Sequence, residues 1–264
     1  MGLGGRKSNS RGMDLSIFFI VIGLIGIWIV ITEGLNIPEY KFPSPISVAS
    51  EIWNLLKSGI LIQNIWASLS LLLYSSAIGA LLAVPLGVGI ALNKYIAGFF
   101  QPLVIFFQSI AGVAWVPLAI VWFGFGNITV TFVVANAVFF IVLFNTMTGV
   151  MTISRNLIHV IKTLGGTKIH VLKEIILPGA LVNILGGLRF GLAFGWRALV
   201  AAEMISSSRG LGFMTLDAAQ YFKSSTVVAG IIVIGILWLF MDRLVLEPIE
   251  NRTVRRWGLL RKQE

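Results

Sequence analysis

Very few side chains of this protein are of the types that carry out covalent chemistry. The 264-residue sequence has no cysteine, which excludes disulfides, thiolate metal sites and thiol catalysis. Its only histidines are His159 and His170, too few to bind a metal ion without carboxylate ligands. The phosphate-binding pattern G-x4-G-K-[ST] does not occur, because the GGTK stretch at 165–168 has its second glycine and its lysine misplaced. The sequence therefore predicts no metal, catalytic or nucleotide site in this chain.

The composition indicates that the chain lies in a membrane. It is 57% hydrophobic and 12% charged, with a mean hydropathy of +0.92, whereas a soluble domain has about a quarter of its residues charged. The apolar runs are continuous and long enough to cross a bilayer as helices, which takes about 20 residues each. They lack the short alternating segments of a β-barrel. The predicted fold class is therefore an all-α polytopic membrane protein.

Six membrane spans are expected. The first follows Arg6, Lys7 and Arg11, as in a signal peptide. Its apolar run is longer than that of a signal peptide, and no small-x-small cleavage site follows, so an uncleaved helix is expected. The six expected spans are 15–31, 65–91, 96–122, 128–150, 181–204 and 227–246.

The distribution of lysine and arginine predicts the orientation. With the N-terminus inside, fourteen of these residues fall in inner segments and only Lys41, Lys57, Arg209 and Lys223 in outer ones. Such an excess marks the cytoplasmic side, so both termini are predicted to be cytoplasmic. The net charge of +9 then needs no nucleic-acid partner. The chain divides into a cytoplasmic tail at 1–14, a transmembrane domain at 15–250 with a cytoplasmic loop at 151–180, and a basic cytoplasmic tail at 251–264.

Three ionisable residues belong to the fifth expected span. Arg189 and Arg197 lie within it, and Glu203 lies near its outer end. Ionisable side chains inside a membrane are costly and usually face a cavity or a partner. The two arginines are about 80° apart around a helix, so both fit one broad face. They predict either a positive field along a pathway for an anion or a structural ion pair, and the residues alone leave both open.

Small residues recur at every fourth position in two of the expected spans. The stripes are Gly79, Ala83, Gly87 and Ala91 in the second span, and Gly187, Gly191 and Gly195 in the fifth. Such stripes let helix backbones approach closely within lipid, so both are predicted to be packing faces. Pro85 and Pro117 are each expected to bend a span, because proline removes an intrahelical hydrogen bond.

Two short helices are expected on the outer side. After the first span, a proline-rich stretch leads to Ser47, a suitable N-cap for an amphipathic helix. The apolar residues Val48, Ile52, Leu55 and Leu56 then lie on one side of that helix. The second short helix is expected within 206–225, before the last span.

The loop at 151–180 is longer than a connection requires. Apolar residues recur at helical spacing on both sides of Gly165 and Gly166, and Thr167 is placed to cap the second half. The spacing predicts two short amphipathic helices that meet at the glycines near the inner membrane face. An apolar stripe rimmed by basic residues fits docking of a cytoplasmic partner. An interfacial connector fits equally well on the residues alone.

Part of this loop matches a known pattern. Nine residues after Gly165 come Ile175, Leu177 and Pro178, which resembles the EAA loop of ABC importer permeases, EAA-x3-G-x9-I-x-LP. His159, Val160 and Ile161 stand in place of EAA. The stretches VPLAIVWFGFG (116–126), FPSPISV (42–48) and TLDAAQ (215–220) extend the resemblance to the nitrate/sulfonate/taurine/bicarbonate branch over roughly 40–257.

The resemblance implies a MetI-like, type I ABC importer permease in a bacterial-type inner membrane. Two identical copies would form the pathway within the lipid bilayer, two cytoplasmic ATPase subunits would dock on the loop, and an extracytoplasmic solute-binding protein would deliver the solute. ATP and Mg²⁺ would bind to the ATPase, so this chain would need no cofactor and would not be an enzyme. The implied solute is a small anion such as nitrate, sulfonate, carboxylate or bicarbonate.

Arg189, Arg197 and Glu203 are candidates to line the translocation pathway, because they are the ionisable residues of the fifth expected span. The resemblance assigns the coupling role to residues of the loop. The ATPase-coupling residues would be His159, Lys162, Leu164, Gly165, Gly166, Thr167, Lys168, Ile175, Leu177 and Pro178. Two alternatives remain: an ion-coupled secondary transporter, which would need acidic residues in mid-span or inverted repeats, and a membrane scaffold that transports nothing.

Overall fold

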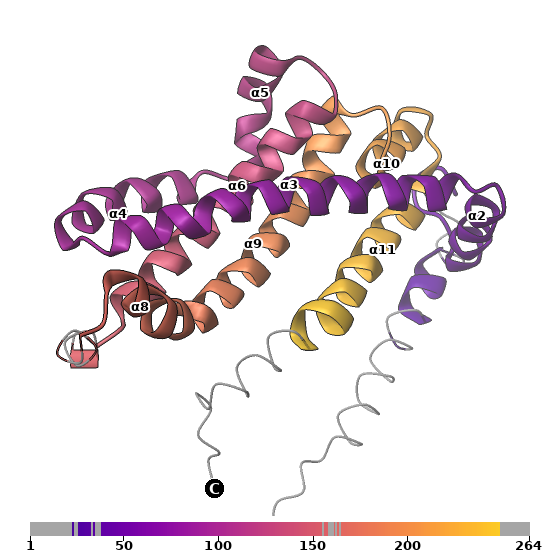
Figure 1. Cartoon of the computed structure of the whole chain (residues 1–264). Helices are drawn as coiled ribbons and strands as arrows, with labels where there is room; N and C mark the ends of the chain where they lie inside the picture. The colour runs from indigo at the N-terminus through magenta and orange to yellow at the C-terminus, as the bar shows by residue number, and fades with distance from the viewer. Residues whose placement is uncertain are drawn as a thin grey trace, which may run out of the picture.

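The structure, a computed structural model, describes residues 23, 26–32, 34, 38–154, 156–157, 161, 163 and 165–248. Every regular element in these residues is a helix, in agreement with the predicted fold class (Figure 1). In chain order they are α2 (Pro45–Lys57), α3 (Ile60–Ala91), α4 (Lys94–Ser109), the 3-10 turn η1 (Gly112–Trp115), α5 (Val116–Phe123), α6 (Asn127–Met151), α8 (Lys168–Val171), the π-helical turn η2 (Leu172–Ile176), α9 (Leu177–Ser206), α10 (Leu211–Gln220), α11 (Ser224–Met241) and the π-helical turn η3 (Asp242–Leu246).

Four of the described helices are long and apolar enough to cross a membrane. They are Ile60–Ala91, Asn127–Met151, Ile169–Ser206 and Ser224–Leu244. The bent pair formed by α4 and η1–α5 makes a fifth if it is counted as one span. Most of the first predicted span, 15–31, lies outside the described residues, so the predicted count of six is not reached within them.

The span predicted at 96–122 is wrong as a continuous helix. Its two halves meet at 90°, because Ile110 and Ala111 leave helical geometry, with ψ angles of 119° and 135°. The chain then packs Gly112 against α9, where a Cβ would lie 2.9 Å from Ala198 Cβ. Pro117 does not make the bend, since it lies in the first turn of α5, where proline is tolerated.

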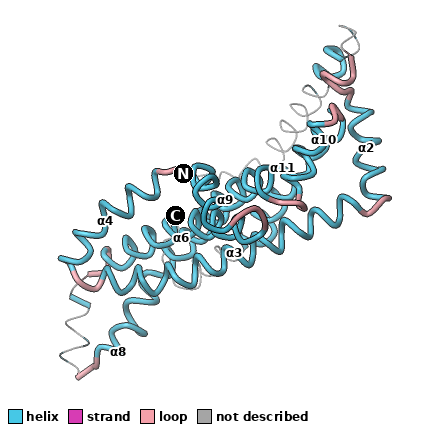
Figure 2. The backbone as a smooth tube through the Cα atoms, turned by 90° about the horizontal axis from the view of Figure 1, so that it is seen from above, coloured by secondary structure: helices cyan, strands magenta, loops and turns pink. Residues whose placement is uncertain are grey.

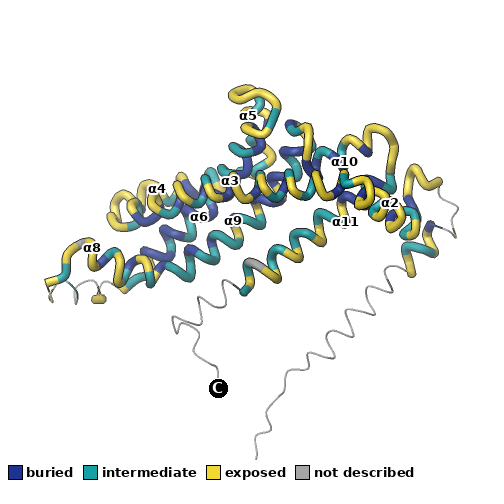
Figure 3. The backbone as a smooth tube through the Cα atoms, turned by 45° about the vertical axis from the view of Figure 1, so that its right-hand side comes forward, coloured by how far each residue is buried: buried dark blue, intermediate teal, exposed yellow. Residues whose placement is uncertain are grey.

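α6 is the centre of the molecule and packs between α3 and α9 (Figures 1 and 3). The glycine stripes of both neighbours face it. A Cβ on Gly79 would lie 2.6 Å from the Ala135 carbonyl oxygen, and one on Gly187 would lie 2.6 Å from Asn145 Cβ. Gly87, Gly191 and Gly195 lie against α6 as well. α6 fills this close-packed core with the buried valines Val130, Val133, Val134, Val138 and Val142.

The bundle has two distinct ends (Figures 1 and 2). α2 and α10 lie at one end, which we call the α2–α10 end; α8 and the turn between α3 and α4 lie at the other, the loop end. α2 starts earlier than predicted, because Ser44 rather than Ser47 is its N-cap. The Ser44 hydroxyl accepts the Ser47 N–H, and Pro45 occupies the first turn. α10 is the short helix predicted within 206–225.

The fifth predicted span is longer than expected, because the chain stays helical through Pro178. α8, η2 and α9 form one helix, Ile169–Ser206, of 38 residues. Proline lacks an N–H, and its ring crowds the carbonyl four residues back. The preceding π turn, in which Leu177 N–H bonds to the Leu172 carbonyl, widens the helix where the proline is accommodated. η3 precedes Pro248 in the same way.

Candidate functional site: a glycine-turn loop and a polar cleft joined by one helix

Gly165 and Gly166 make the turn between the two parts of the loop. Gly165 has φ +81°, in the left-handed region where other residues are strained. Gly166 N–H bonds to the Ile161 carbonyl at 2.9 Å, which is the six-residue bond of a Schellman helix end. A Cβ on Gly166 would lie 2.3 Å from Ile161 Cγ2. The first glycine is therefore required for backbone conformation and the second for space.

The helix after the turn begins with a cap in which a histidine side chain binds the N-cap residue. Thr167 is the N-cap, and its carbonyl accepts the Val171 N–H at 3.1 Å. His170 Nδ1 accepts the Thr167 N–H at 3.2 Å and lies 2.8 Å from Thr167 Oγ1. In a capping box the back-bond comes from Glu or Gln three residues after the cap. His170 takes that place here and fixes the direction in which the helix leaves the turn.

The other predicted coupling residues fall into two groups. His159, Lys162 and Leu164 lie outside the described residues. The second group forms the start of the long helix: Lys168 opens α8, Ile175 lies in η2, and Leu177 and Pro178 open α9.

The loop has a buried apolar face and an exposed one. Val171 and Ile176 are buried in a cluster with Val88 of α3 and Val150 of α6. On the other face Ile169 is 63% exposed, and Leu177 is also exposed. The buried face holds the loop to the ends of the core helices, and the exposed side chains leave an apolar surface uncovered in this chain.

The two arginines of α9 lie in different environments. Arg189 donates from Nε and Nη2 to the two carboxylate oxygens of Asp242, at 2.8 and 2.9 Å, and so ties α9 to η3. Arg189 thus has the structural ion pair that was one of its two predicted environments. Arg197 is exposed, and its guanidinium carbon lies 5.4 Å from the centroid of the Phe194 ring. Phe190 and Phe194 are exposed on the same face of α9.

Glu203 is fully buried where α9 meets α3 and α10. Its carboxylate accepts hydrogen bonds from the Ser68 hydroxyl at 2.7 Å and from Gly212 N–H at 2.9 Å. Ser68 Oγ in turn accepts the Leu211 N–H at 2.9 Å. Both N–H groups belong to the first turn of α10, where unpaired donors and the helix dipole favour a carboxylate. Glu203 and Ser68 together cap the N-terminus of α10.

The partners of Glu203 are not evident from the sequence. Gly210 has φ +120°, and a Cβ there would lie 2.4 Å from the Glu203 carboxyl group. A Cβ on Gly212 would lie 2.3 Å from the Val200 carbonyl oxygen. The one sequence feature that could have indicated these partners is the Gly-Leu-Gly triplet at 210–212, which follows Glu203. Nothing in the sequence links Ser68 to Glu203, because the two residues are 135 positions apart in the chain.

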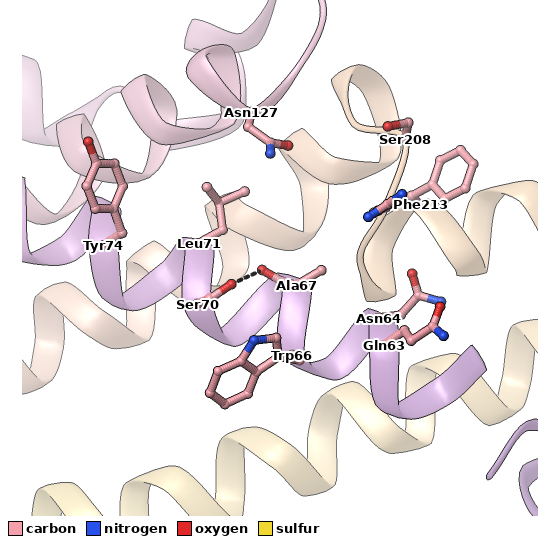
Figure 4. A pocket seen from close by; sticks show the side chains of 11 residues that line it. Gln63, Asn64, Trp66, Ala67, Ser70, Leu71, Tyr74, Asn127, Ser208 and Phe213 are labelled. Atoms are coloured by element: carbon pink, nitrogen blue, oxygen red, sulfur yellow. Dashed lines mark hydrogen bonds between the residues drawn. The ribbon is translucent and has the colours of Figure 1, made fainter. Parts of the chain in front are cut away.

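A cleft of about 1140 Å³ lies beside this joint, at the α2–α10 end (Figure 4). It is formed by α3, the first residue of α6, the connection between α9 and α10, and the start of α10. Its lining residues are Gln63, Asn64, Trp66, Ala67, Ser70, Leu71, Tyr74, Asn127, Ser208, Arg209 and Phe213. This lining is largely polar, and Arg209 is its one charged member.

Comparison with known proteins identifies the architecture. A family model described as "Binding-protein-dependent transport system inner membrane component" matches residues 79–246. The chain belongs to this family. The permease is therefore a membrane component of a transport system, and the predicted resemblance to ABC importer permeases is confirmed.

Individual relatives agree with this assignment. The permease is 33% identical to the taurine transport system permease protein TauC of Escherichia coli K12, over 92% of this chain and 90% of the relative. It is 32% identical to the putative aliphatic sulfonates transport permease protein SsuC of Bacillus subtilis 168, over 89% of this chain and 84% of the relative. A chain of the inward-facing MetNI methionine ABC transporter has a TM-score of 0.62 at 17% identity, covering 75% of this chain and 96% of that one. The predicted branch and the MetI-like fold are thereby confirmed.

Replacing Glu203 by glutamine is expected to loosen the α2–α10 end of the permease. The amide keeps one acceptor oxygen and places an NH₂ donor among the Ser68 and Gly212 donors. We expect the free energy of unfolding to fall by about 1–3 kcal/mol, measured as a lower melting temperature of the purified permease. Asp217→Asn makes the same chemical change on the exposed face of α10 and should leave the melting temperature unchanged. Equal effects of the two substitutions would contradict the role of Glu203.

Proposed function

We propose that this permease is the membrane-spanning subunit of an ATP-driven importer that moves a small anionic solute, of the sulfonate kind, into the cell. The family assignment supports transport together with a solute-binding protein. The relatives named for taurine and for aliphatic sulfonates support the class of solute. Transport would proceed by alternating access, driven from the loop at 159–178.

One observation carries this proposal: a single helix joins the loop to the far end of the bundle. Ile169–Ser206 has 38 residues, which corresponds to about 57 Å at 1.5 Å per residue. Its first turn follows the Thr167 cap, and its last turns hold Glu203 and Ser206. The Ser206 hydroxyl accepts the N–H of Gly126 in the α5–α6 turn at 3.2 Å. A displacement of the loop would therefore be transmitted by one continuous helix to α3, the α5–α6 turn and α10.

The exposed part of the loop is the proposed docking site of the ATPase. Ile169 and Leu177 offer apolar surface there, and the glycine turn and the Thr167 cap fix its shape. Two ATPase subunits would bind the loops of two identical permease copies and would supply the ATP and Mg²⁺ sites. The loop end and both termini would be cytoplasmic, and the α2–α10 end would face outward to the solute-binding protein, as the count of basic residues favours.

The exposed face of α9 is the proposed wall of the pathway. Arg197 lies on this face well inside the span, where contact with lipid would be costly. A water-filled path between two copies of the permease would hydrate the Arg197 guanidinium. Arg189 is assigned instead to holding η3 against α9, because Asp242 neutralises it. Glu203 is assigned to transmitting movement rather than to contacting solute, because it is fully buried.

Gly165 offers a test of the coupling loop that separates backbone conformation from bulk. A Cβ at this position would meet no atom within 4 Å, so only the left-handed φ restricts it. Gly165→Val should separate ATP hydrolysis from uptake, because β-branched residues strongly disfavour this conformation. Gly165→Asn, which tolerates it, should retain most of the coupling. The measurement is the number of solute molecules imported per ATP hydrolysed in vesicles, and full coupling in Gly165→Val would contradict the assignment.

Arg197 and Arg189 should respond differently to substitution. In vesicles that contain the permease, its ATPase and its binding protein, Arg197→Ala should lower ATP-dependent taurine uptake by about tenfold to a hundredfold, because a charge-assisted contact contributes about 1.5–3 kcal/mol. The melting temperature of the purified Arg197→Ala permease should not change. Arg189→Ala should lower the melting temperature, and the double variant Arg189→Ala/Asp242→Ala should recover part of it, since no unpaired charge remains.

The same vesicles test the proposed function as a whole. Wild-type uptake in Arg197→Ala would contradict its place in the pathway. Absence of ATP-dependent uptake of any tested anion by the unaltered complex would contradict the importer itself.

A further inference from the structure

The cleft at the α2–α10 end has the chemistry of a binding site for an anion. We propose that it receives the anionic group of the solute before the solute crosses the membrane, and that the Arg209 guanidinium is its cation. This inference rests on the proposed import of a small anion and names a site for it. The cleft volume of about 1140 Å³ is ample for a solute of this size.

The charge of the cleft is uncompensated within the described part of the chain. Arg209 is exposed, and none of the residues that line the cleft with it is acidic. The nearest carboxylate along the chain, Glu203, is buried beneath the loop and turned towards Ser68 and the Gly212 N–H. No described acidic residue forms an ion pair with Arg209. An exposed guanidinium with this setting favours a ligand with a carboxylate or sulfonate group, whose oxygens match its donors.

The backbone that carries Arg209 is fixed on both sides. Ser207 Oγ accepts the Arg209 N–H at 3.3 Å and donates to the Arg209 carbonyl at 2.7 Å. The next N–H, of Gly210, donates to Asn64 Oδ1 of α3 at 2.8 Å. Leu211 N–H donates to Ser68. The cation is therefore presented from a loop anchored to α3, and little ordering is needed when an anion binds.

The other residues that line the cleft suit a small polar solute rather than one with a long apolar chain. Figure 4 shows Asn127 at the start of α6, and Ser208 and Phe213 beside the α9–α10 connection. The N-terminus of α6 adds the positive end of a helix dipole near Asn127, and its first N–H groups have no partner within the helix. Gln63 and Ser70 of α3 contribute further groups that form hydrogen bonds.

The absence of cysteine from the chain allows a direct test. Ser70→Cys places a thiol in the cleft, and Ser50→Cys places one on the exposed face of α2, outside it. In vesicles with the complete importer, each thiol is treated with a thiosulfonate reagent that carries either a sulfonate or a trimethylammonium group. Labelling of this chain is followed by mass spectrometry.

The expected result is a preference for the anionic reagent in the cleft. In water, a cation about 8 Å from a thiol changes the ratio of the labelling rates for the anionic and cationic reagents by about fivefold. Ser70→Cys should show this preference relative to Ser50→Cys. Arg209→Gln should abolish it and Arg209→Lys should keep it. Taurine in excess should slow labelling of Ser70→Cys only while Arg209 or Lys is present.

Two outcomes overturn the proposal. One is the same reagent preference in Ser70→Cys with and without Arg209. The other is failure of Ser70→Cys to react while Ser50→Cys does. Uptake by the complex without cysteine substitutions is measured separately. If that complex imports taurine but the preference is absent, only the cleft assignment is wrong. If it imports none of the tested anions, the importer proposal is wrong, and this one with it.

Discussion

The structure depends on how closely α6 approaches its two neighbours. Within lipid there is no hydrophobic gain from bringing apolar helices together, so association relies on van der Waals packing and hydrogen bonds. The glycines of α3 and α9 provide the van der Waals packing, because the atoms of α6 occupy the space where Cβ atoms would be. Gly79 and Gly187 meet α6 at distances that no side chain would permit. The three helices therefore form one packed unit, and elements attached to their ends are positioned relative to one another.

Different interactions attach the two ends to this unit. At the loop end, Val171 and Ile176 pack apolar surface onto α3 and α6. At the α2–α10 end, Glu203 and Ser68 form a buried polar network whose donors are the first N–H groups of α10. A polar network of this kind is directional, so it specifies how α10 and the Arg209 loop are oriented and not only that they are in contact. The loop end therefore keeps an exposed apolar surface, and the far end holds a fixed geometry around a cleft.

Regular patterns in the sequence predicted the fold well, and irregular local features did not. The four-residue glycine spacing is set by helix geometry, so it can be read from the residues. The spacing from Gly165 to Pro178 is recognised by its resemblance to a family pattern. The break at Ile110 and Ala111 cannot be read from the residues, because both are apolar and the contact that follows, of Gly112 with α9, joins segments far apart in the chain. Helical continuation through Pro178 depends on a π turn that has no sequence signature. The partners of Glu203 come from α3 and α10, so its role appears only when the chain is folded.

The central claim is that the long helix Ile169–Ser206 moves as one rigid body and carries movement from the loop to the cleft at the α2–α10 end. It is tested most directly by distances between spin labels at Glu174→Cys and Ile205→Cys, two exposed positions near the ends of the long helix. Labelled copies are diluted with unlabelled ones for the distance within a chain, and Ile205→Cys alone reports the distance between copies. On binding of a non-hydrolysable ATP analogue to the complete importer, we predict an unchanged distance within the chain and a changed distance between copies. A changed distance within the chain, with the outer ends unmoved, would contradict the account.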